Sequence, residues 1–231
     1  MDRVVIITGS TRGIGFETAA EFLRNGDRVV IFCRHKSHVT DATNHLSRIG
    51  NSEDILSLVG DVRMVKDVKR ILSQSLKRFG RVDILINNAG IGAYKPIEKT
   101  GEKEWDNIVN TNLKGCFLFI QEVLPIMKRQ GRGIIINVSS GLGVEGIANF
   151  SAYCASKFGA VGLTQVAADE TLGSGIKVYA VLPAAVNTKL ISDIGLKMDP
   201  SELMAPEYVA RRIFEVAEGK KRSGHLIEIY S

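Results

Sequence analysis

The feature that most constrains this chain is the alternation of short apolar runs with longer segments of helical periodicity. The short runs are rich in β-branched residues and recur seven times. They span Val4 to Thr8, Arg28 to Cys33, Ile55 to Val59, Val82 to Asn87, Gly133 to Ser139, Lys177 to Leu182 and His225 to Ile229. Between them, apolar residues recur at helical spacing, as in Val65, Val68, Ile71 and Leu72. This alternation predicts repeated βαβ units and a parallel sheet.

Several of the runs are continuously apolar, such as Ile134 to Ile136, and strands of that kind are covered on both faces. With 231 residues, 45% of them hydrophobic and 24% charged, the chain is large enough for one good core. We therefore expect an α/β fold. It comprises one Rossmann-type domain over residues 1–231, with a doubly wound, seven-stranded parallel sheet and helices on both faces.

Composition and charge argue against several classes of partner. No apolar stretch is long enough to span a bilayer, and the N-terminus enters the first strand without a signal-type segment. We expect a cytoplasmic protein with no membrane partner. The net charge of +5 comes from basic residues spread along the chain, without an interleaved aromatic platform. We expect no nucleic-acid partner.

The cysteines and histidines lack the spacing of a metal site. Cys33, Cys116 and Cys154 are odd in number and form no C-x-x-C pair, which favours free thiols over a disulfide framework. The neighbouring His35 and His38 show no metal-ligand spacing. We expect no metal. The chain also lacks the G-x-S-x-G elbow of α/β-hydrolases and the G-x-x-x-x-G-K-[ST] loop of P-loop nucleotidases.

A glycine-rich turn follows the first predicted strand and opens a helix at about Ile14. It reads Thr8-Gly9-Ser10-Thr11-Arg12-Gly13-Ile14-Gly15. Glycines at such a turn let the backbone approach a pyrophosphate, whose charge is stabilised by the free N–H groups of the helix N-terminus. The G-x-x-x-G-x-G spacing in this position favours dinucleotide binding over a plain tight turn.

The end of the second predicted strand indicates which dinucleotide is bound. A NAD-binding Rossmann protein places an acid there, on the ribose 2′-hydroxyl, about 20 residues after the glycine turn. This chain has Cys33-Arg34-His35 instead. Arg34, with Arg12 from the glycine turn, predicts charge-assisted contacts to the 2′-phosphate of NADP, although both could be ordinary surface arginines.

A serine, a tyrosine and a lysine indicate acid–base chemistry. Ser139 and Ser140 end the fifth predicted strand, and Tyr153 and Lys157 follow four residues apart, on one face of a helix. We expect the Lys157 ammonium to lower the pKa of the Tyr153 phenol and to prepare it for proton transfer. Alone, a Y-x-x-x-K spacing is usually a solvated helix face.

Together these motifs resemble the short-chain dehydrogenase/reductase family, nearest to its 3-oxoacyl-acyl-carrier-protein reductase-like members. The resemblance runs in order over nearly the whole chain. The matching stretches are Thr8 to Gly15, Asp61-Val62, Asn87 to Gly90, Asn112, Ser139 to Gly143, Tyr153 to Lys157, and Pro183 to Thr188. It implies hydride transfer between NADP(H) and a ketone, a 3-oxoacyl group or the matching secondary alcohol.

The resemblance also implies roles for individual residues. The catalytic tetrad is Asn112, Ser140, Tyr153 and Lys157, with Ser140 chosen over Ser139 because the family serine lies thirteen residues before the tyrosine. Tyr153 is the acid/base, Ser140 hydrogen-bonds the substrate oxygen, Lys157 binds the nicotinamide ribose, and Asn112 holds a water joined to Lys157. The implied cofactor-binding residues are Gly9, Ser10, Thr11, Arg12, Gly13, Ile14, Gly15, Arg34, Asp61, Val62, Asn88, Ala89, Gly90, Tyr153, Lys157, Pro183, Val186 and Thr188.

Other expectations remain open at the level of the sequence. Ala184 stands where the family usually has glycine, which puts the backbone geometry beside the nicotinamide in doubt. We expect a small-molecule carbonyl or alcohol substrate and a homodimer or homotetramer, through the helices that carry Asn112 to Met127 and Tyr153 to Leu172. The alternative is a catalytically silent NADP-binding sensor on the same fold, although the tetrad is intact.

Overall fold

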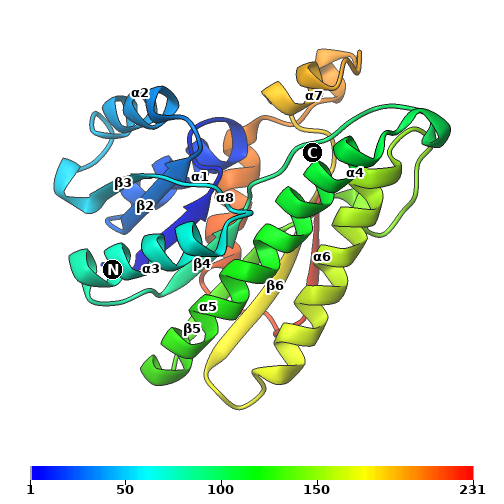
Figure 1. Ribbon diagram of the computed structural model, residues 1–231. Helices are drawn as coiled ribbons and strands as arrows, with labels where there is room; N and C mark the ends of the chain where they lie inside the picture. The colour runs from blue at the N-terminus through cyan, green and yellow to red at the C-terminus, as the bar shows by residue number, and fades with distance from the viewer. Residues whose placement is uncertain (1, 231) are drawn as a thin grey trace.

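The computed structural model describes residues 2–230, and its seven strands form one sheet in the order β3-β2-β1-β4-β5-β6-β7 (Figure 1). Every neighbouring pair in this sheet is parallel. The strands are β1 (Val4–Thr8), β2 (Arg28–Cys33), β3 (Ile55–Val59), β4 (Ile84–Asn87), β5 (Gly133–Val138), β6 (Ile176–Pro183) and β7 (Leu226–Ile229). The predicted α/β fold with a doubly wound, seven-stranded parallel sheet is confirmed.

The first three predicted strands have the observed boundaries, and the other four differ from the observed ones by one or two residues. The largest shift is in β4, which begins at Ile84 and not at Val82. The backbone N–H and carbonyl of Val82 are both taken by the side-chain amide of Gln130, at 3.0 and 2.7 Å. Val82 is therefore tied to a helix before its chain enters the sheet, a side-chain interaction that apolar patterning does not reveal.

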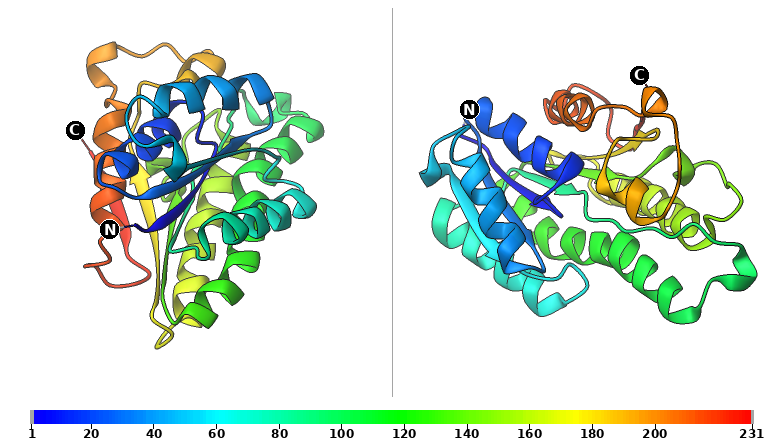
Figure 2. Two further views of the ribbon diagram at one scale, coloured as in Figure 1. Left: turned by 90° about the vertical axis from the view of Figure 1, so that its left-hand side faces the viewer. Right: turned by 90° about the horizontal axis from the view of Figure 1, so that it is seen from above.

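Helices cover both faces of the sheet. They are α1 (Gly13–Arg24), α2 (Lys36–Leu46), α3 (Val65–Phe79), α4 (Glu102–Val109), α5 (Gly115–Gln130), α6 (Ser151–Glu170), α7 (Lys189–Asp193) and α8 (Pro206–Val216). Buried side chains of α1, α2 and α8 belong to one apolar cluster and those of α3, α5 and α6 to the other. Seen from above, α1 and α8 lie on the opposite side of the sheet from α5 and α6 (Figure 2).

The central strand β1 shows why the apolar runs are continuous. Val5 and Ile7 point into the cluster under α1 and α8, whereas Val4 and Ile6 point into the cluster under α3 and α5. All four side chains are fully buried. Burial on both faces removes the polar alternation that a half-exposed strand shows, as we predicted from the sequence.

A π-helical turn, Asn110–Lys114, joins α4 to α5. Turns of this kind are rare within helices and occur often at functional sites, because the extra residue redirects side chains. Here the turn carries Asn112, which is buried. The sequence predicts a helix that carries Asn112 to Met127, and the structure places the start of this segment in the π-helical turn.

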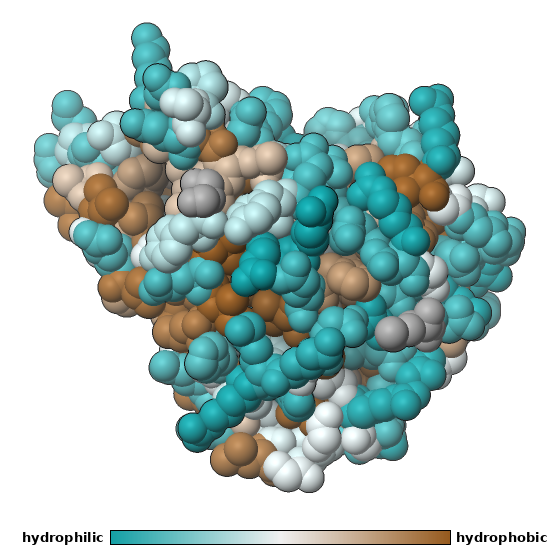
Figure 3. Space-filling model, turned by 180° about the vertical axis from the view of Figure 1, so that it is seen from behind, coloured by the Kyte–Doolittle hydropathy of each residue, from teal (hydrophilic) through white to brown (hydrophobic). Residues whose placement is uncertain are grey.

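The surface is mostly hydrophilic when seen from behind, with apolar side chains gathered in separate patches (Figure 3). On α5, on α6 and in the turn that follows α6, four large apolar side chains are exposed: Phe117, Phe158, Val166 and Leu172. Within residues 2–230, none of the helices has the length and apolar character needed to cross a bilayer.

Candidate active site

A cavity of about 1010 Å³ lies at the edge of the sheet where the parallel strands end. In doubly wound folds this edge is where ligands bind. Most of the residues singled out from the sequence line the cavity. They are Gly9, Thr11, Arg12, Gly13, Ile14, Arg34, Asp61, Val62, Asn88, Ala89, Gly90, Ser140, Tyr153, Lys157, Pro183, Val186 and Thr188. The three others, Ser10, Gly15 and Asn112, are buried behind its wall.

The glycine turn needs its glycines for backbone conformation and for space. Gly9 has φ +63°, and a Cβ there would lie 2.9 Å from the Cα of Ala89. A Cβ on Gly15 would lie 2.4 Å from both Asn88 Nδ2 and the Gly9 carbonyl oxygen. Because no side chain caps α1, its first N–H groups remain available beside the cavity. This part of the cavity fits an anionic group.

Buried hydrogen bonds hold that turn against the neighbouring strands. The Ser10 hydroxyl accepts from the Phe32 N–H at 2.9 Å. Asn88 Nδ2 donates to the carbonyls of Thr8 and Gly9 at 3.0 and 3.1 Å. The Thr8 hydroxyl accepts from the N–H groups of Asn88 and Ala89 at 2.9 and 2.8 Å. Ser10 and Gly15 therefore shape the turn from behind, and Thr8 does so without having been assigned a role from the sequence.

The end of the cavity beside β2 carries the arginines predicted for the 2′-phosphate. Arg12 and Arg34 are both exposed and line the cavity. Arg12 Nη2 also lies 3.4 Å from Asp193 Oδ2 of α7, so α7 and the glycine turn share an ion pair. Asp61 accepts from Arg63 Nε through both carboxylate oxygens at 3.0 Å. Burial alone would raise the Asp61 pKa, but the bonds from Arg63 outweigh it and lower that pKa.

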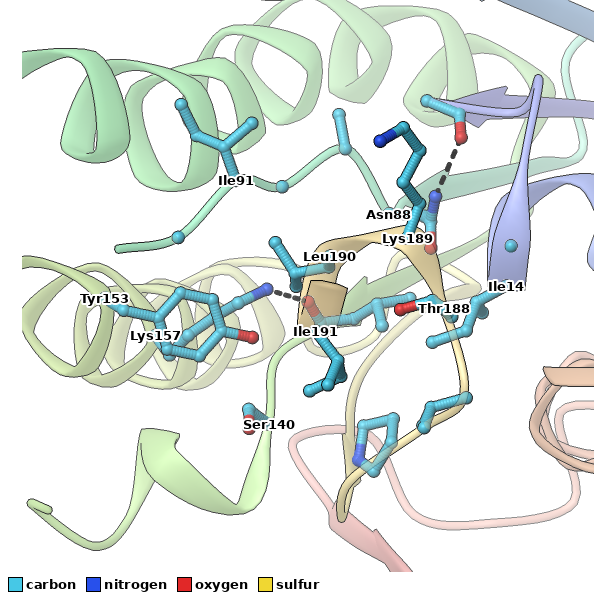
Figure 4. Close-up of a pocket in the computed structure, with 18 of the residues that line it drawn as sticks. Ile14, Asn88, Ile91, Ser140, Tyr153, Lys157, Thr188, Lys189, Leu190 and Ile191 are labelled. Carbon is cyan, nitrogen blue, oxygen red and sulfur yellow. Dashed lines mark hydrogen bonds between the residues drawn. The ribbon is translucent and has the colours of Figure 1, made fainter. Parts of the chain in front are cut away.

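Tyr153, Ser140 and Lys157 meet at the middle of the cavity (Figure 4). Lys157 Nζ donates to the Val138 carbonyl at 2.8 Å and lies 5.5 Å from the centre of the Tyr153 ring. Burial lowers the pKa of Lys157 to about 8. Burial also raises the pKa of Tyr153 to about 12, although a hydrogen bond with Ser140 opposes the change. The Tyr153 pKa is therefore raised and not lowered as expected from the sequence, because desolvation of the phenolate outweighs the hydrogen bond with Ser140.

The two serines after β5 separate as expected. The Ser139 hydroxyl is buried and donates to the Lys157 carbonyl at 3.0 Å. Ser140 faces the cavity, and its hydroxyl accepts from the Leu142 N–H at 3.2 Å. Of the two, only Ser140 interacts with the Tyr153 hydroxyl.

The side chain of Asn112 stays behind the cavity wall. It accepts from the Ile91 N–H and donates to the Ile91 carbonyl, both at 2.9 Å, and it donates to Ser156 Oγ at 3.0 Å. A Cβ on Gly90 would lie 3.6 Å from both Asn112 Oδ1 and Lys157 Nζ. Asn112 therefore fixes the segment that follows β4, beside Lys157. These bonds leave its side chain little capacity to bind a water.

A family model described as short chain dehydrogenase matches residues 3–199. The chain belongs to the short-chain dehydrogenase family. The levodione reductase of Leifsonia aquatica is 34% identical over 229 residues, covering 99% of this chain and 84% of that one. A 3-oxoacyl-[acyl-carrier-protein] reductase of Thermotoga maritima is 32% identical over 237 residues, covering 98% and 96%.

Solved structures agree with this family assignment. The crystal structure of levodione reductase has a TM-score of 0.93 at 29% identity, covering 99% of this chain and 96% of that one. A 3-ketoacyl-(acyl-carrier-protein) reductase from Brucella melitensis, complexed with NADH, has a TM-score of 0.90 at 28% identity, covering 98% and 96%. The resemblance predicted from the motifs is confirmed, and this short-chain dehydrogenase is an oxidoreductase.

The backbone at Ala184 resolves the doubt that the missing glycine raised. Within the described residues, the non-glycine residues with positive φ are Asp2 and Asn149. Ala184 therefore avoids the left-handed region that favours glycine, and its N–H donates to the Ile229 carbonyl at 3.1 Å. The added methyl group causes no backbone strain in this short-chain dehydrogenase.

The other end of the cavity has walls that sequence motifs did not identify. Its apolar lining residues are Leu142, Val144, Ile147, Phe150, Leu190, Ile191, Ile194, Leu196 and Met198. A Cβ on Gly92 would lie 3.3 Å from Tyr153 Cδ2, 3.5 Å from Ile194 Cγ2 and 3.7 Å from Leu190 Cδ1. Leu190 of α7 and Ile194 just after it therefore lie on the same side of Gly92 as the Tyr153 ring, in the part of the cavity where Figure 4 labels Tyr153 and Leu190. We take this part of the cavity as the substrate end.

Proposed function

We propose that this chain is an NADP(H)-dependent reductase of a ketone or 3-oxoacyl group, or a dehydrogenase of the matching secondary alcohol. The observation that carries the proposal is the meeting of Tyr153, Ser140 and Lys157 in one cavity with the glycine turn. The names of the relatives, levodione reductase and 3-oxoacyl-[acyl-carrier-protein] reductase, support ketone chemistry.

Tyr153 is the proton donor in this proposal. With its pKa raised to about 12 by burial, the phenol carries its proton at neutral pH. A carbonyl oxygen at the hydroxyls of Tyr153 and Ser140 receives a hydrogen bond from each, and these bonds strengthen as negative charge develops on that oxygen. The phenol proton then passes to the oxygen, and the alcohol is released.

Lys157 supports this proton transfer from behind. Its ammonium group uses one N–H to hydrogen-bond the Val138 carbonyl. The other N–H groups remain available for a ribose hydroxyl and for a chain of waters. Its charge also stabilises the phenolate that Tyr153 becomes after donation. Asn112 positions the backbone beside Lys157 through its bonds to Ile91.

The residues present fit a nicotinamide dinucleotide. The closely packed glycines at Gly9 and Gly15 leave room for a pyrophosphate at the start of α1. When bound, the reduced nicotinamide supplies the hydride. Arg12 and Arg34 would hold a 2′-phosphate, and Asp61 and Val62 would flank the adenine. Pro183, Val186 and Thr188 would lie along the nicotinamide and the phosphates.

The proposal also includes a homo-oligomer. Phe117 on α5, Phe158 and Val166 on α6, and Leu172 just after α6 are between 43% and 76% exposed. Pairing of these two helices with their copies would bury this apolar surface, which supports a dimer. A single species with the mass of one chain in sedimentation velocity would refute it.

The substitution Tyr153→Phe tests the chemistry. It deletes the proton donor and keeps the ring, so we expect kcat for ketone reduction to fall by about 10² to 10⁴. The dissociation constant for NADPH should change little. Tyr208→Phe, an exposed tyrosine of α8, is the matched control and should behave like the parent.

Two outcomes would contradict the proposal in different ways. If Tyr153→Phe kept most of the parent kcat, the acid–base assignment would be wrong. If the parent bound NADPH tightly but reduced no ketone, aldehyde or acyl thioester in a broad screen, the protein would be a cofactor-binding sensor.

A further inference from the structure

Two carboxylates, Glu145 and Glu228, line the substrate end of the cavity. The position of Glu228 follows from strand β7. Ile227 and Ile229 are 6% and 1% exposed and belong to the apolar cluster under α1 and α8. Successive side chains of a strand point to opposite faces, so Glu228 and Tyr230 point away from that cluster. Both of them line the cavity. The pairing of Leu182 with Glu228 places this wall beside the end of β6.

The loop that follows β5 brings a second carboxylate to the same place. Glu145 lines the cavity, and the Tyr230 hydroxyl donates to Glu228 Oε2 at 2.8 Å. The pKa of Tyr230 is raised by its hydrogen bond to Glu228 and by the charges of both Glu228 and Glu145. Glu145 and Glu228 therefore line one cavity from two separate segments of the chain.

Among the cavity-lining residues that the structure describes, no lysine or arginine forms an ion pair with Glu145 or Glu228. Arg12, Arg34, His35 and His38 line the other end, beside β2. At the substrate end, Lys189 Nζ is paired with Asp193 and Lys157 Nζ is bonded to the Val138 carbonyl. The substrate end therefore combines an apolar interior with a negative rim.

Tyr153 and Ser140 fix where the carbonyl of a substrate must lie, and the apolar walls of Leu142, Phe150 and Ile194 fix the character of its carbon skeleton. A group on the far side of that skeleton meets Glu145, Glu228 and Tyr230. An anionic group there is repelled by both carboxylates, whereas an ammonium or hydroxyl group can donate hydrogen bonds to them.

We propose that this enzyme selects compact apolar ketones that carry a cationic or hydrogen-bond-donating group remote from the carbonyl, and that Glu145 and Glu228 discriminate against anionic substrates. This inference rests on the proposed ketone reductase function. It disfavours phosphate-bearing thioesters and an acidic acyl carrier as the substrate, even though acyl-carrier reductases are among the relatives.

A matched set of cyclohexanones tests the inference with NADPH in excess. 4-Aminocyclohexanone, 4-hydroxycyclohexanone and 4-oxocyclohexanecarboxylate share one ring and one carbonyl and differ in charge. We expect kcat/KM to fall in that order, with a difference of about tenfold or more between the ammonium and the carboxylate at low ionic strength. Added salt should shrink the difference, because both glutamates are exposed.

The variants Glu145→Gln, Glu228→Gln and their combination assign the effect to these residues. Each single variant should reduce the ammonium-to-carboxylate ratio, and the double variant should bring it close to one. Glu170→Gln makes the same charge change at the far end of α6 and should leave the ratio unchanged. Acetoacetyl-N-acetylcysteamine and acetoacetyl-coenzyme A form a second pair, with the neutral thioester preferred by the parent.

The possible results distinguish a failure of the specificity inference from a failure of the proposed reductase function. If the parent reduces all three cyclohexanones at equal kcat/KM, or prefers the carboxylate, the inference is overturned and the reductase function stands. The same holds if the ratio persists unchanged in the double variant. If no ketone of either set is reduced, the proposed function itself fails.

Discussion

The two ends of the cavity are built in different ways. At the cofactor end, glycine backbone and buried hydrogen bonds from Thr8, Ser10 and Asn88 shape a surface that leaves little room for other side chains. At the substrate end, exposed or half-exposed side chains come from the loop after β5, from α7 and from β7. The first end is specified by backbone packing and the second by loop side chains.

This difference explains how one scaffold can keep its cofactor and change its substrate. A substitution in the glycine turn collides with the backbone of a neighbouring strand. A substitution on α7 meets mainly the cavity and solvent. We therefore expect changes at the cofactor end to affect stability and cofactor affinity, and changes at the substrate end to affect specificity.

The largest effect expected in this comparison is on cofactor preference. Each charged hydrogen bond from Arg12 or Arg34 to a 2′-phosphate contributes roughly 1.5 to 3 kcal/mol, reduced by the exposure of both side chains. NADPH should therefore be preferred over NADH by about tenfold to a thousandfold in kcat/KM. Arg34→Asp should reverse the preference, by repelling the phosphate and accepting from the ribose diol.

The measurement is kcat/KM for each cofactor at saturating ketone, for the parent and for Arg34→Asp. Arg48→Asp is a suitable control, since Arg48 follows α2 and does not line the cavity. Equal use of both cofactors by the parent, unchanged in the variant, would leave Arg34 without the assigned role.

The next largest effect comes from replacing a glycine at each end of the cavity by alanine. Gly9→Ala forces a Cβ to within 2.9 Å of the Ala89 Cα at φ +63°. We expect a loss of roughly 1–3 kcal/mol of stability and a rise of about tenfold or more in the NADPH dissociation constant. Gly146→Ala, in the loop after β5, meets no atom within 4 Å and should behave like the parent.

Thermal unfolding and fluorescence titration with NADPH measure both quantities. If the two alanine variants were equally stable and bound NADPH equally well, the contrast between a packed cofactor end and an open substrate end would not hold.

A pH profile examines Lys157, which lies between the two ends. Burial lowers its pKa from 10.5 to about 8, so the ammonium is present below that pH and is lost as the pH rises through it. Tyr153, with a pKa of about 12, keeps its proton over the same range. The kcat for reduction should be level below pH 8 and should fall by about tenfold per pH unit well above it.

Steady-state rates at saturating NADPH and ketone give this profile, and circular dichroism at each pH shows that the fold is retained. Lys157→Arg keeps the charge at high pH and should flatten the descending limb, even at a lower rate. A parent profile that stays level to pH 10 would contradict the role given to the ammonium.

The smallest effect concerns the contact between the two ends. Asp193 of α7 lies 3.4 Å from Arg12, and each side chain is substantially exposed. Exposed ion pairs contribute about 0.2–1 kcal/mol, so Asp193→Asn should tighten NADPH binding by about 1.4-fold to fivefold by freeing Arg12 for the 2′-phosphate. NADH binding should not change.

Isothermal titration with both cofactors measures the effect. Asp199→Asn removes a carboxylate from the same segment, where its partner is Ser201, and is the matched control. Equal changes for NADPH and NADH would indicate that Asp193 acts on the cavity as a whole and not through Arg12.

Much of this molecule was determined by local sequence. Apolar runs such as Val4 to Thr8 specify buried strands because both of their faces need apolar side chains, and the glycine turn specifies its own place because only glycine tolerates φ near +63° beside Ala89. The ordered motifs also identified the family. They singled out Ser140, Tyr153 and Lys157, which line one cavity in the structure.

The tertiary structure decided what depends on contacts between distant segments. Burial, which the spacing of Tyr153 and Lys157 does not reveal, reversed the expected shift in the Tyr153 pKa. Asn112, which we expected to hold a water at the cavity, is instead buried and holds the neighbouring segments together through hydrogen bonds to Ile91 and Ser156. Glu145 and Glu228 are 83 residues apart in the sequence and line one cavity only because the loop after β5 and the end of strand β7 lie at the same edge of the sheet.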